Sequence, residues 1–242
     1  MPVIHTWRSA GLTHKGKVRA RNEDAFLDRP ERGLWAVADG MGGHQAGHLA
    51  SQMVIAGLDE LILEGDFDEQ LRQVRQCLHW VNRRLGDEMT VVANRADNIM
   101  GSTVVALLLQ DNRAACVWAG DSRCYLWRGN RLFQLSRDHS LKQQWISEQS
   151  ISPQEASQRA GANALTRALG AGDQLKLEIL ELEVRHGDTF LLCSDGLYNG
   201  VSDEALGKAL SLHLPGIALE HMFENVMRGR ASDNLTGVVI RQ

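Results

Sequence analysis

Five acidic positions in this chain of 242 residues lie directly beside short apolar runs. They are Asp24, which follows Asn22-Glu23, and Asp39, Asp121, Asp195 and Asp233. Asp39 follows the run Trp35–Ala38 and precedes Gly40, and Asp195 follows the run Thr189–Ser194 in the same way. A single acid–glycine pair is usually only a turn, in which the carboxylate caps the local backbone. A carboxylate at the edge of a core is costly without a positive partner, so the repeated pattern indicates a partner that the acids share.

Divalent metal ions are the simplest partners for such a set of acids. Carboxylates, backbone carbonyls and water are the oxygen ligands that Mg²⁺ and Mn²⁺ prefer. Glycine at position 40 would let its carbonyl approach an ion without a Cβ in the way. Acids from several strand ends favour two ions, which in such sites lie about 3.5–4 Å apart and activate a bridging water. A calcium loop is not favoured, because the chain contains no D-x-D-x-D-G run.

The elements that carry these acids are predicted from the apolar pattern. Apolar residues step by three and four over residues 45–63 and 67–89, which predicts two consecutive helices that pack as a pair. Short apolar runs between turn residues predict antiparallel strands at 101–109, 114–118, 123–127 and 132–135. Further strands are expected at 175–182, 188–193 and 235–240, and further helices at 203–212 and 217–227. The whole pattern predicts an α+β fold.

Composition and charge narrow the class of protein. Hydrophobic residues make up 43% and charged residues 23%, which is typical of a globular chain, and no linker or repeat divides the predicted single domain over 1–242. The net charge of -4 argues against nucleic acid as the main partner. No apolar run approaches the roughly 20 residues of a membrane span, and the N-terminus lacks a signal-peptide pattern. The four cysteines form no C-x-x-C pair, so we expect a reduced, cytoplasmic protein without a zinc site.

Eight short motifs occur here in the order found in the metal-dependent serine/threonine protein phosphatases, the PPM family. They are Arg19–Asp24, Asp39–His44, Gly101–Thr103, Gly120–Arg123, Asp138-His139, Thr166–Gly170, Ser194–Leu197 and Asp233–Thr236. The match runs from about Ala10 to Val239, and its Asp-Gly-Met-Gly-Gly form resembles the bacterial, single-domain branch. The resemblance implies a four-layer α-β-β-α sandwich, in which helix pairs flank two antiparallel sheets. It also implies a variable flap at about 141–164 beside the active site.

The resemblance implies a ligand set for two Mn²⁺ or Mg²⁺ ions. The matching residues are Asp39, Gly40, Asp195, Asp233, Asp24, Glu23 and Asp121. Asp39 would bridge both ions, the Gly40 carbonyl would bind one of them, and Asp195 and Asp233 would be the remaining direct ligands. The acids at 23 and 24 would hold metal-bound water. Asp121, together with Asp195, would hold a third and looser ion.

Two further roles in catalysis concern phosphate binding and proton transfer. Arg19, three residues before Asn22, matches the arginine that binds the substrate phosphate, whereas Arg21 does not fit that spacing. Animal members carry their general acid, a histidine, two places after the bridging aspartate, where this chain has Met41. His44 is the nearest substitute in sequence, and a structural role at a helix N-terminus explains it at least equally well. The general acid therefore stays unassigned.

These features predict hydrolysis of phosphoserine and phosphothreonine in proteins by a water that two ions activate, opposing a bacterial serine/threonine kinase. In size and general likeness the chain is also similar to the phosphatases paired with a kinase and a forkhead-associated-domain protein in type VI secretion. The alternative is a non-catalytic phosphoprotein-binding module of the same fold, which would be expected to lack a ligand acid. Neither a nucleotide-binding loop nor a cysteine phosphatase is favoured, because the chain lacks G-x-x-x-x-G-K-[ST] and C-x₅-R patterns.

Overall fold

Two antiparallel β-sheets face each other in the computed structural model, which describes residues 7–42, 46–92 and 100–242. The first sheet has the order β1–β11–β10–β7–β8. Its strands are β1 Arg8–His14, β7 Arg123–Arg128, β8 Arg131–Gln134, β10 Thr189–Cys193 and β11 Leu235–Arg241. The second sheet has the order β2–β3–β5–β6–β9, and β4 pairs with β3 beside this path. Its strands are β2 Asp24–Arg29, β3 Leu34–Met41, β4 Gly101–Ser102, β5 Val104–Gln110, β6 Arg113–Ala119 and β9 Glu178–Glu183.

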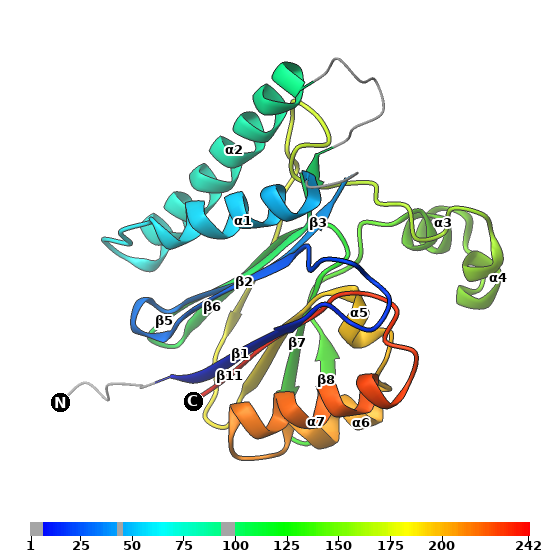
Figure 1. Ribbon diagram of the computed structural model, residues 1–242. Helices are drawn as coiled ribbons and strands as arrows, with labels where there is room; N and C mark the ends of the chain where they lie inside the picture. The colour runs from blue at the N-terminus through cyan, green and yellow to red at the C-terminus, as the bar shows by residue number, and fades with distance from the viewer. Residues whose placement is uncertain (1–6, 43–45, 93–99) are drawn as a thin grey trace.

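Helices cover the outer face of each sheet (Figure 1). The second sheet is covered by α1 Ala46–Asp59 and α2 Phe67–Val92, and the first by α6 Asp203–Leu210 and α7 Pro215–Arg228. The short helices are η1 Pro30–Arg32, α5 Asp195–Tyr198, α3 Leu141–Gln149 and α4 Pro153–Gln158, of which α3 and α4 project from the sandwich. The predicted α-β-β-α sandwich is therefore confirmed. In the described part of the chain, no helix has both the length and the apolar character needed to cross a bilayer.

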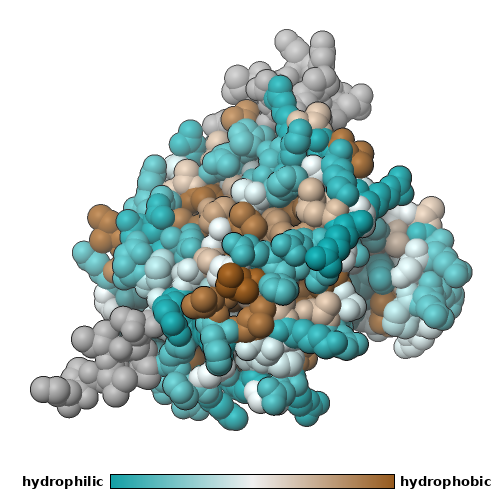
Figure 2. Space-filling model, turned by 60° about the horizontal axis from the view of Figure 1, so that its bottom comes forward, coloured by the Kyte–Doolittle hydropathy of each residue, from teal (hydrophilic) through white to brown (hydrophobic). Residues whose placement is uncertain are grey.

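Three apolar clusters fill the spaces between the four layers. Alternate residues of β3 face opposite ways: Ala36 and Ala38 pack toward α1 and α2, whereas Trp35 and Val37 pack between the two sheets with Phe190. A third cluster joins α6 and α7 to the first sheet. Because both faces of β3 are covered, its sequence is a continuous apolar run. The outer surface in Figure 2 is largely hydrophilic, with apolar side chains in a group near the centre of the view and at scattered single positions.

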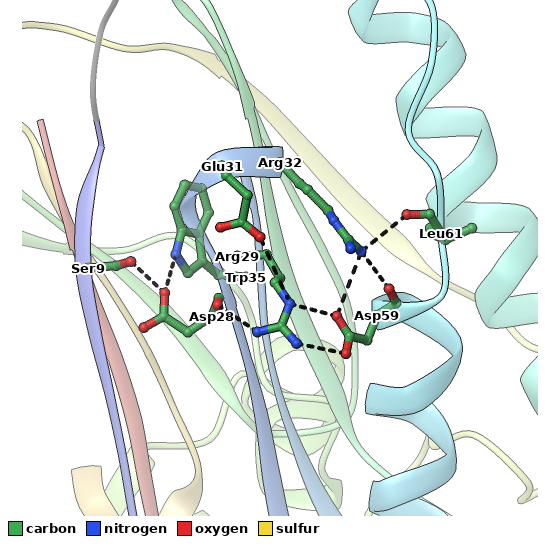
Figure 3. A network of polar contacts seen from close by, with 8 residues as sticks. All are labelled: Ser9, Asp28, Arg29, Glu31, Arg32, Trp35, Asp59 and Leu61. Atoms are coloured by element: carbon green, nitrogen blue, oxygen red, sulfur yellow. Dashed lines mark hydrogen bonds and ion pairs between the residues drawn. The ribbon is translucent and has the colours of Figure 1, made fainter.

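A polar network at one edge of the sandwich joins both sheets to α1 (Figure 3). Asp28 on β2 accepts hydrogen bonds from the Ser9 hydroxyl on β1 and from the indole nitrogen of Trp35, the latter at 2.9 Å. Arg29 forms two hydrogen bonds with the Asp59 carboxylate at the end of α1, at 2.7 and 2.8 Å. These contacts fix the outer end of β2 against its neighbours.

The structure differs from the sequence prediction at the ends of several elements. The strand predicted at 101–109 is divided into β4 and β5 by Thr103, whose N–H donates to the Asp39 carbonyl at 2.8 Å. β3 continues to Met41, so Asp39 lies within the strand and does not end it. The predicted flap contains α3 and α4, whose first turns are capped by the Ser140 and Ser152 hydroxyls.

Candidate active site

A cavity of about 670 Å³ lies beside the C-terminal end of β3, and acids from five separate segments line it. These acids are Glu23, Asp39, Asp121, Asp195 and Asp233. Arg19, Gly40, Met41 and Thr103 also line the cavity, as do residues 163 and 165–168 around the end of the predicted flap. The fold therefore gathers around one space most of the residues that the sequence predicted for the site.

Hydrogen bonds hold the backbone of Asp39 through both its N–H and its carbonyl. Its N–H donates to the Thr103 hydroxyl at 3.0 Å, and its carbonyl accepts from the Thr103 N–H at 2.8 Å and from the Ser102 hydroxyl at 3.1 Å. Burial raises the pKa of the Asp39 carboxyl well above its usual range, and the nearby Asp24 and Asp195 charges raise it further. The backbone of Asp39 is thus fixed, and a cation near its carboxylate would stabilise the charged form.

Asp24 pairs with Asp39 across β2 and β3 and lies behind the cavity, with an exposed fraction of 3%. One of its carboxylate oxygens, Oδ2, accepts a hydrogen bond from the Ser194 hydroxyl at 2.7 Å. The other, Oδ1, is buried and has no hydrogen-bond partner among the described residues. Burial raises the pKa of Asp24 to about 6. A buried oxygen without a donor is the kind of atom that a cation or a metal-bound water would satisfy.

Gly40 and Glu23 present oxygen atoms to the same residue of α1. The Gly40 N–H donates to the Glu23 carbonyl at 3.1 Å. A Cβ on Gly47 would lie 2.9 Å from both the Gly40 carbonyl oxygen and a Glu23 carboxylate oxygen. A Cβ on Gly40 would lie only 1.9 Å from the Gly47 carbonyl oxygen. The close passage of α1 therefore requires a glycine at position 40.

Two further acids of the cavity, Asp195 and Asp121, also have raised pKa values. Burial raises the pKa of Asp195, at the start of α5, to about 6, and the Asp233 charge adds to the effect. Burial raises the pKa of Asp121, in the turn between β6 and β7, to about 7, and here the Asp195 charge adds to it. These carboxylates are close enough to repel one another, and their charged forms need cations nearby.

The donor set fits divalent ions in its chemistry, although it is not a closed ligand cluster. The oxygens offered are carboxylates and one backbone carbonyl, which are the ligands of Mg²⁺ and Mn²⁺. Within the described ranges, no three Asp, Glu, His or Cys side chains form a group tight enough to hold an ion by themselves. An ion bound here would therefore complete its coordination with the carbonyl and with water, as Mg²⁺ commonly does.

Arg19 lies at the edge of the cavity on the loop between β1 and β2. Its Nη2 is 2.8 Å from an Asp233 oxygen, and this hydrogen bond raises the pKa of the guanidinium. The side chain is 53% exposed, so much of it faces solvent. His44 lies outside the described residues, and no histidine is among the described residues that line the cavity. Met41 does line it, at the position where animal members carry the histidine.

Uncharged residues, to which the sequence motifs assigned no separate role, hold the acids in place. The Asn234 side chain accepts from the Glu23 N–H at 2.8 Å and donates to the carbonyls of Lys15 at 3.0 Å and Arg21 at 2.9 Å. The Ser194 hydroxyl accepts a hydrogen bond from the Thr236 N–H at 3.0 Å and donates one to Asp24 behind the cavity. Both residues are adjacent to acids in the quoted motifs, and this adjacency could have predicted their supporting role.

Solved structures share this architecture and therefore give the class of protein. PppA, described as a key regulatory component of T6SS in Pseudomonas aeruginosa, is 40% identical, with a TM-score of 0.89 and 97% of each chain covered. The catalytic domain of the serine/threonine protein phosphatase PstP in complex with two manganese ions is 35% identical, with a TM-score of 0.83 and 97% of each chain covered. A sequence model of protein phosphatase 2C matches residues 11–236. The chain belongs to the protein phosphatase 2C family.

Curated relatives carry the same description along most of this chain. PstP of Mycobacterium tuberculosis, a serine/threonine protein phosphatase, is 36% identical over 232 residues, which are 96% of this chain and 44% of PstP. The serine/threonine phosphatase Stp of Listeria monocytogenes is 32% identical over 203 residues, which are 82% of this chain and 81% of Stp. The chain thus spans less than half the length of PstP.

Proposed function

We propose that this chain removes phosphate from phosphoserine and phosphothreonine in proteins, with Mn²⁺ or Mg²⁺ as cofactor. The observation that carries the proposal is the gathering of five acids, Gly40 and Arg19 around one cavity in a member of the protein phosphatase 2C family. Asp39 would bridge two ions, with Gly40, Asp195 and Asp233 as further direct ligands. Glu23 and the buried Asp24 would hold their water ligands, and Asp121 with Asp195 would hold a third ion.

Bound ions of this kind lower the pKa of a shared water and so supply the nucleophile. The chain's own residues bind and orient the phosphate. The Arg19 guanidinium can form two parallel hydrogen bonds with non-bridging phosphate oxygens, which fixes the phosphorus relative to Asp39. The same contact stabilises the charge that these oxygens carry in the transition state. No residue of the chain needs to form a bond with phosphorus.

The test of this proposal is a phosphatase assay on phosphoserine and phosphothreonine peptides. We expect hydrolysis that depends on Mn²⁺, that stops when a chelator is added and that returns when Mn²⁺ is restored. Asp39→Asn keeps the size of the side chain but removes its charge, so we expect it to lower kcat by at least about 100-fold. Activity that survives both the chelator and Asp39→Asn would refute the two-ion assignment. Binding of phosphopeptides without hydrolysis by wild type would favour the non-catalytic module.

We further propose that the substrates are phosphorylated by a partner serine/threonine kinase in the bacterial cytoplasm. All four cysteines are free in the structure, which is consistent with a reducing compartment. The similarity to PppA, described as a regulatory component of T6SS, supports a place in type VI secretion. A kinase and a forkhead-associated-domain protein would be its partners there. Comparison of the phosphoproteome with and without the protein tests this assignment. Accumulated phosphorylation on secretion proteins would support it, and an unchanged phosphorylation level on them would refute it.

A further inference from the structure

Two segments beside the cavity carry basic residues with no acid among them: the loop after β1, and the end of α7 with the loop that follows it. Residues 15–21 contain Lys15, Lys17, Arg19 and Arg21, and residues 225–232 contain Arg228 and Arg230. We call Lys15, Lys17, Arg21, Arg228 and Arg230 the basic surface, and treat Arg19 separately because it lines the cavity. All five side chains of the basic surface are exposed. This local excess of positive charge occurs in a chain whose net charge is -4.

Backbone contacts hold the two loops together. The Lys17 N–H donates to the Ala231 carbonyl at 2.8 Å, and the Lys17 ammonium donates to the Gly229 carbonyl at 3.0 Å. Gly16 has a φ of +75°, and a Cβ there would lie 2.1 Å from the Asp233 carbonyl oxygen. In Figure 1 the blue loop after β1 and the red loop before β11 run side by side next to α5. The basic residues therefore share one rim, and Arg19 lies within it.

Among the described residues, most of this charge has no carboxylate partner. Arg228 pairs with Glu224 at 3.3 Å, whereas Lys15, Arg21 and Arg230 form no ion pair with any described residue. Exposed arginines elsewhere are often paired, as Arg113 is with two acids. Unpaired charges beside a cavity attract ligands of the opposite sign and increase their local concentration.

The position of the basic surface relative to Arg19 indicates which part of a ligand it meets. When the phosphate of a substrate binds Arg19, the residues that flank the phosphorylated residue lie next to residues 15–21, because Arg19 belongs to this loop. Val18, between Lys17 and Arg19, is 65% exposed and offers an apolar contact to the same segment. A flanking segment with acidic side chains would therefore find cations on both loops.

We propose that the basic surface binds acidic residues that flank the phosphorylated residue, and that the chain consequently prefers phosphoproteins with acidic sequences around the site. This inference rests on the proposed phosphatase function and specifies the substrate class of the same site. The binding is electrostatic and solvent-exposed, so each cation contributes about a two- to fivefold preference, and salt weakens it. The effect falls on KM more than on kcat, because the flanking residues take no part in the chemistry.

Two phosphothreonine peptides that differ only in their flanks, glutamate in one and glutamine in the other, test the inference. For wild type we expect a kcat/KM about tenfold higher for the glutamate peptide at low salt, with the ratio falling toward one as salt is added. The single variant Arg230→Glu should reduce the ratio, and the double variant Lys15→Glu/Arg21→Glu should shift the preference to a lysine-flanked peptide. A loop with only a structural role would not produce this reversal.

The matched control is Arg75→Glu, which reverses an exposed charge on α2 in the opposite outer layer. It should keep the wild-type ratio between the two peptides. Equal kcat/KM values for both peptides, with Mn²⁺-dependent hydrolysis intact, would overturn the inference and leave the proposed function standing. A lack of hydrolysis of either peptide by wild type would instead refute the proposed function, and the inference with it.

Discussion

At the residue scale, Arg19 has contacts that separate substrate binding from water activation. Its guanidinium lies 2.8 Å from Asp233 at the cavity edge, with half of the side chain exposed. We expect Arg19→Ala to raise KM for a phosphopeptide about tenfold or more, with a smaller change in kcat, because the contact with phosphate already exists in the bound substrate. Arg19→Lys should give an intermediate KM, since a lysine keeps the charge but loses the planar fork. Steady-state kinetics measure both values, and an unchanged KM would contradict the assigned role.

Ser194 is the residue on which the buried charge behind the cavity depends. Its hydroxyl donates to Asp24 at 2.7 Å and accepts the Thr236 N–H at 3.0 Å. Ser194→Ala would leave two buried polar groups without partners, so we expect the free energy of unfolding to fall by about 1–3 kcal/mol. Urea unfolding measures the change. The control is Ser211→Ala, an exposed hydroxyl bonded to the Lys208 carbonyl, for which we expect a smaller loss. Equal losses in the two variants would contradict this account.

At the scale of elements, the edge network of Figure 3 combines a buried and an exposed contact. Trp35 is 0% exposed, and Asp28→Ala would leave its indole N–H buried without an acceptor. We expect a loss of about 1–3 kcal/mol in the free energy of unfolding. Both side chains of the Arg29–Asp59 pair are more than one third exposed, so Asp59→Ala should destabilise the fold less than Asp28→Ala does. Urea unfolding measures the loss of stability in each variant. A larger loss for Asp59→Ala than for Asp28→Ala would contradict this order and show that the exposed pair contributes more to stability.

Element prediction from the sequence succeeded where the apolar pattern is continuous. The predicted helices at 67–89 and 217–227 correspond to α2 and α7, and the predicted strand at 235–240 corresponds to β11. β1 was not predicted, because as an edge strand it is only partly covered and its residues do not form an apolar run. α3 was not predicted either, because none of its residues is buried and so it has no apolar stripe.

At the scale of the whole molecule, the cavity acids couple stability to pH and metal. Burial raises the pKa of Asp24 and Asp195 to about 6 and that of Asp121 to about 7. In the presence of a chelator, which removes metal ions, the folded protein therefore holds protons between about pH 4 and pH 7 that the unfolded chain has lost. Its free energy of unfolding should fall as pH rises through this window and level off above it.

Urea unfolding in the presence of a chelator, at about pH 5 and about pH 8, measures this dependence. We expect lower stability at the higher pH, because the buried carboxylates are then charged without cations beside them. Added Mn²⁺ should stabilise the folded state through binding, and the increase should be larger at the higher pH. A free energy of unfolding that rises with pH over this range in the presence of the chelator would contradict the raised pKa values.

The sequence by itself determined the local features of this protein. The apolar periodicity gave the fold class, and the eight motifs gave the family and the acids of the candidate site, because both depend on residue types at short spacing. Only the tertiary structure decided which residues meet. It placed Asp24 behind Asp39, explained Gly40 by its contact with Gly47, and brought the loop of Arg19 against the loop before β11. These contacts join residues far apart in the chain, and local patterns carry no information on such distances.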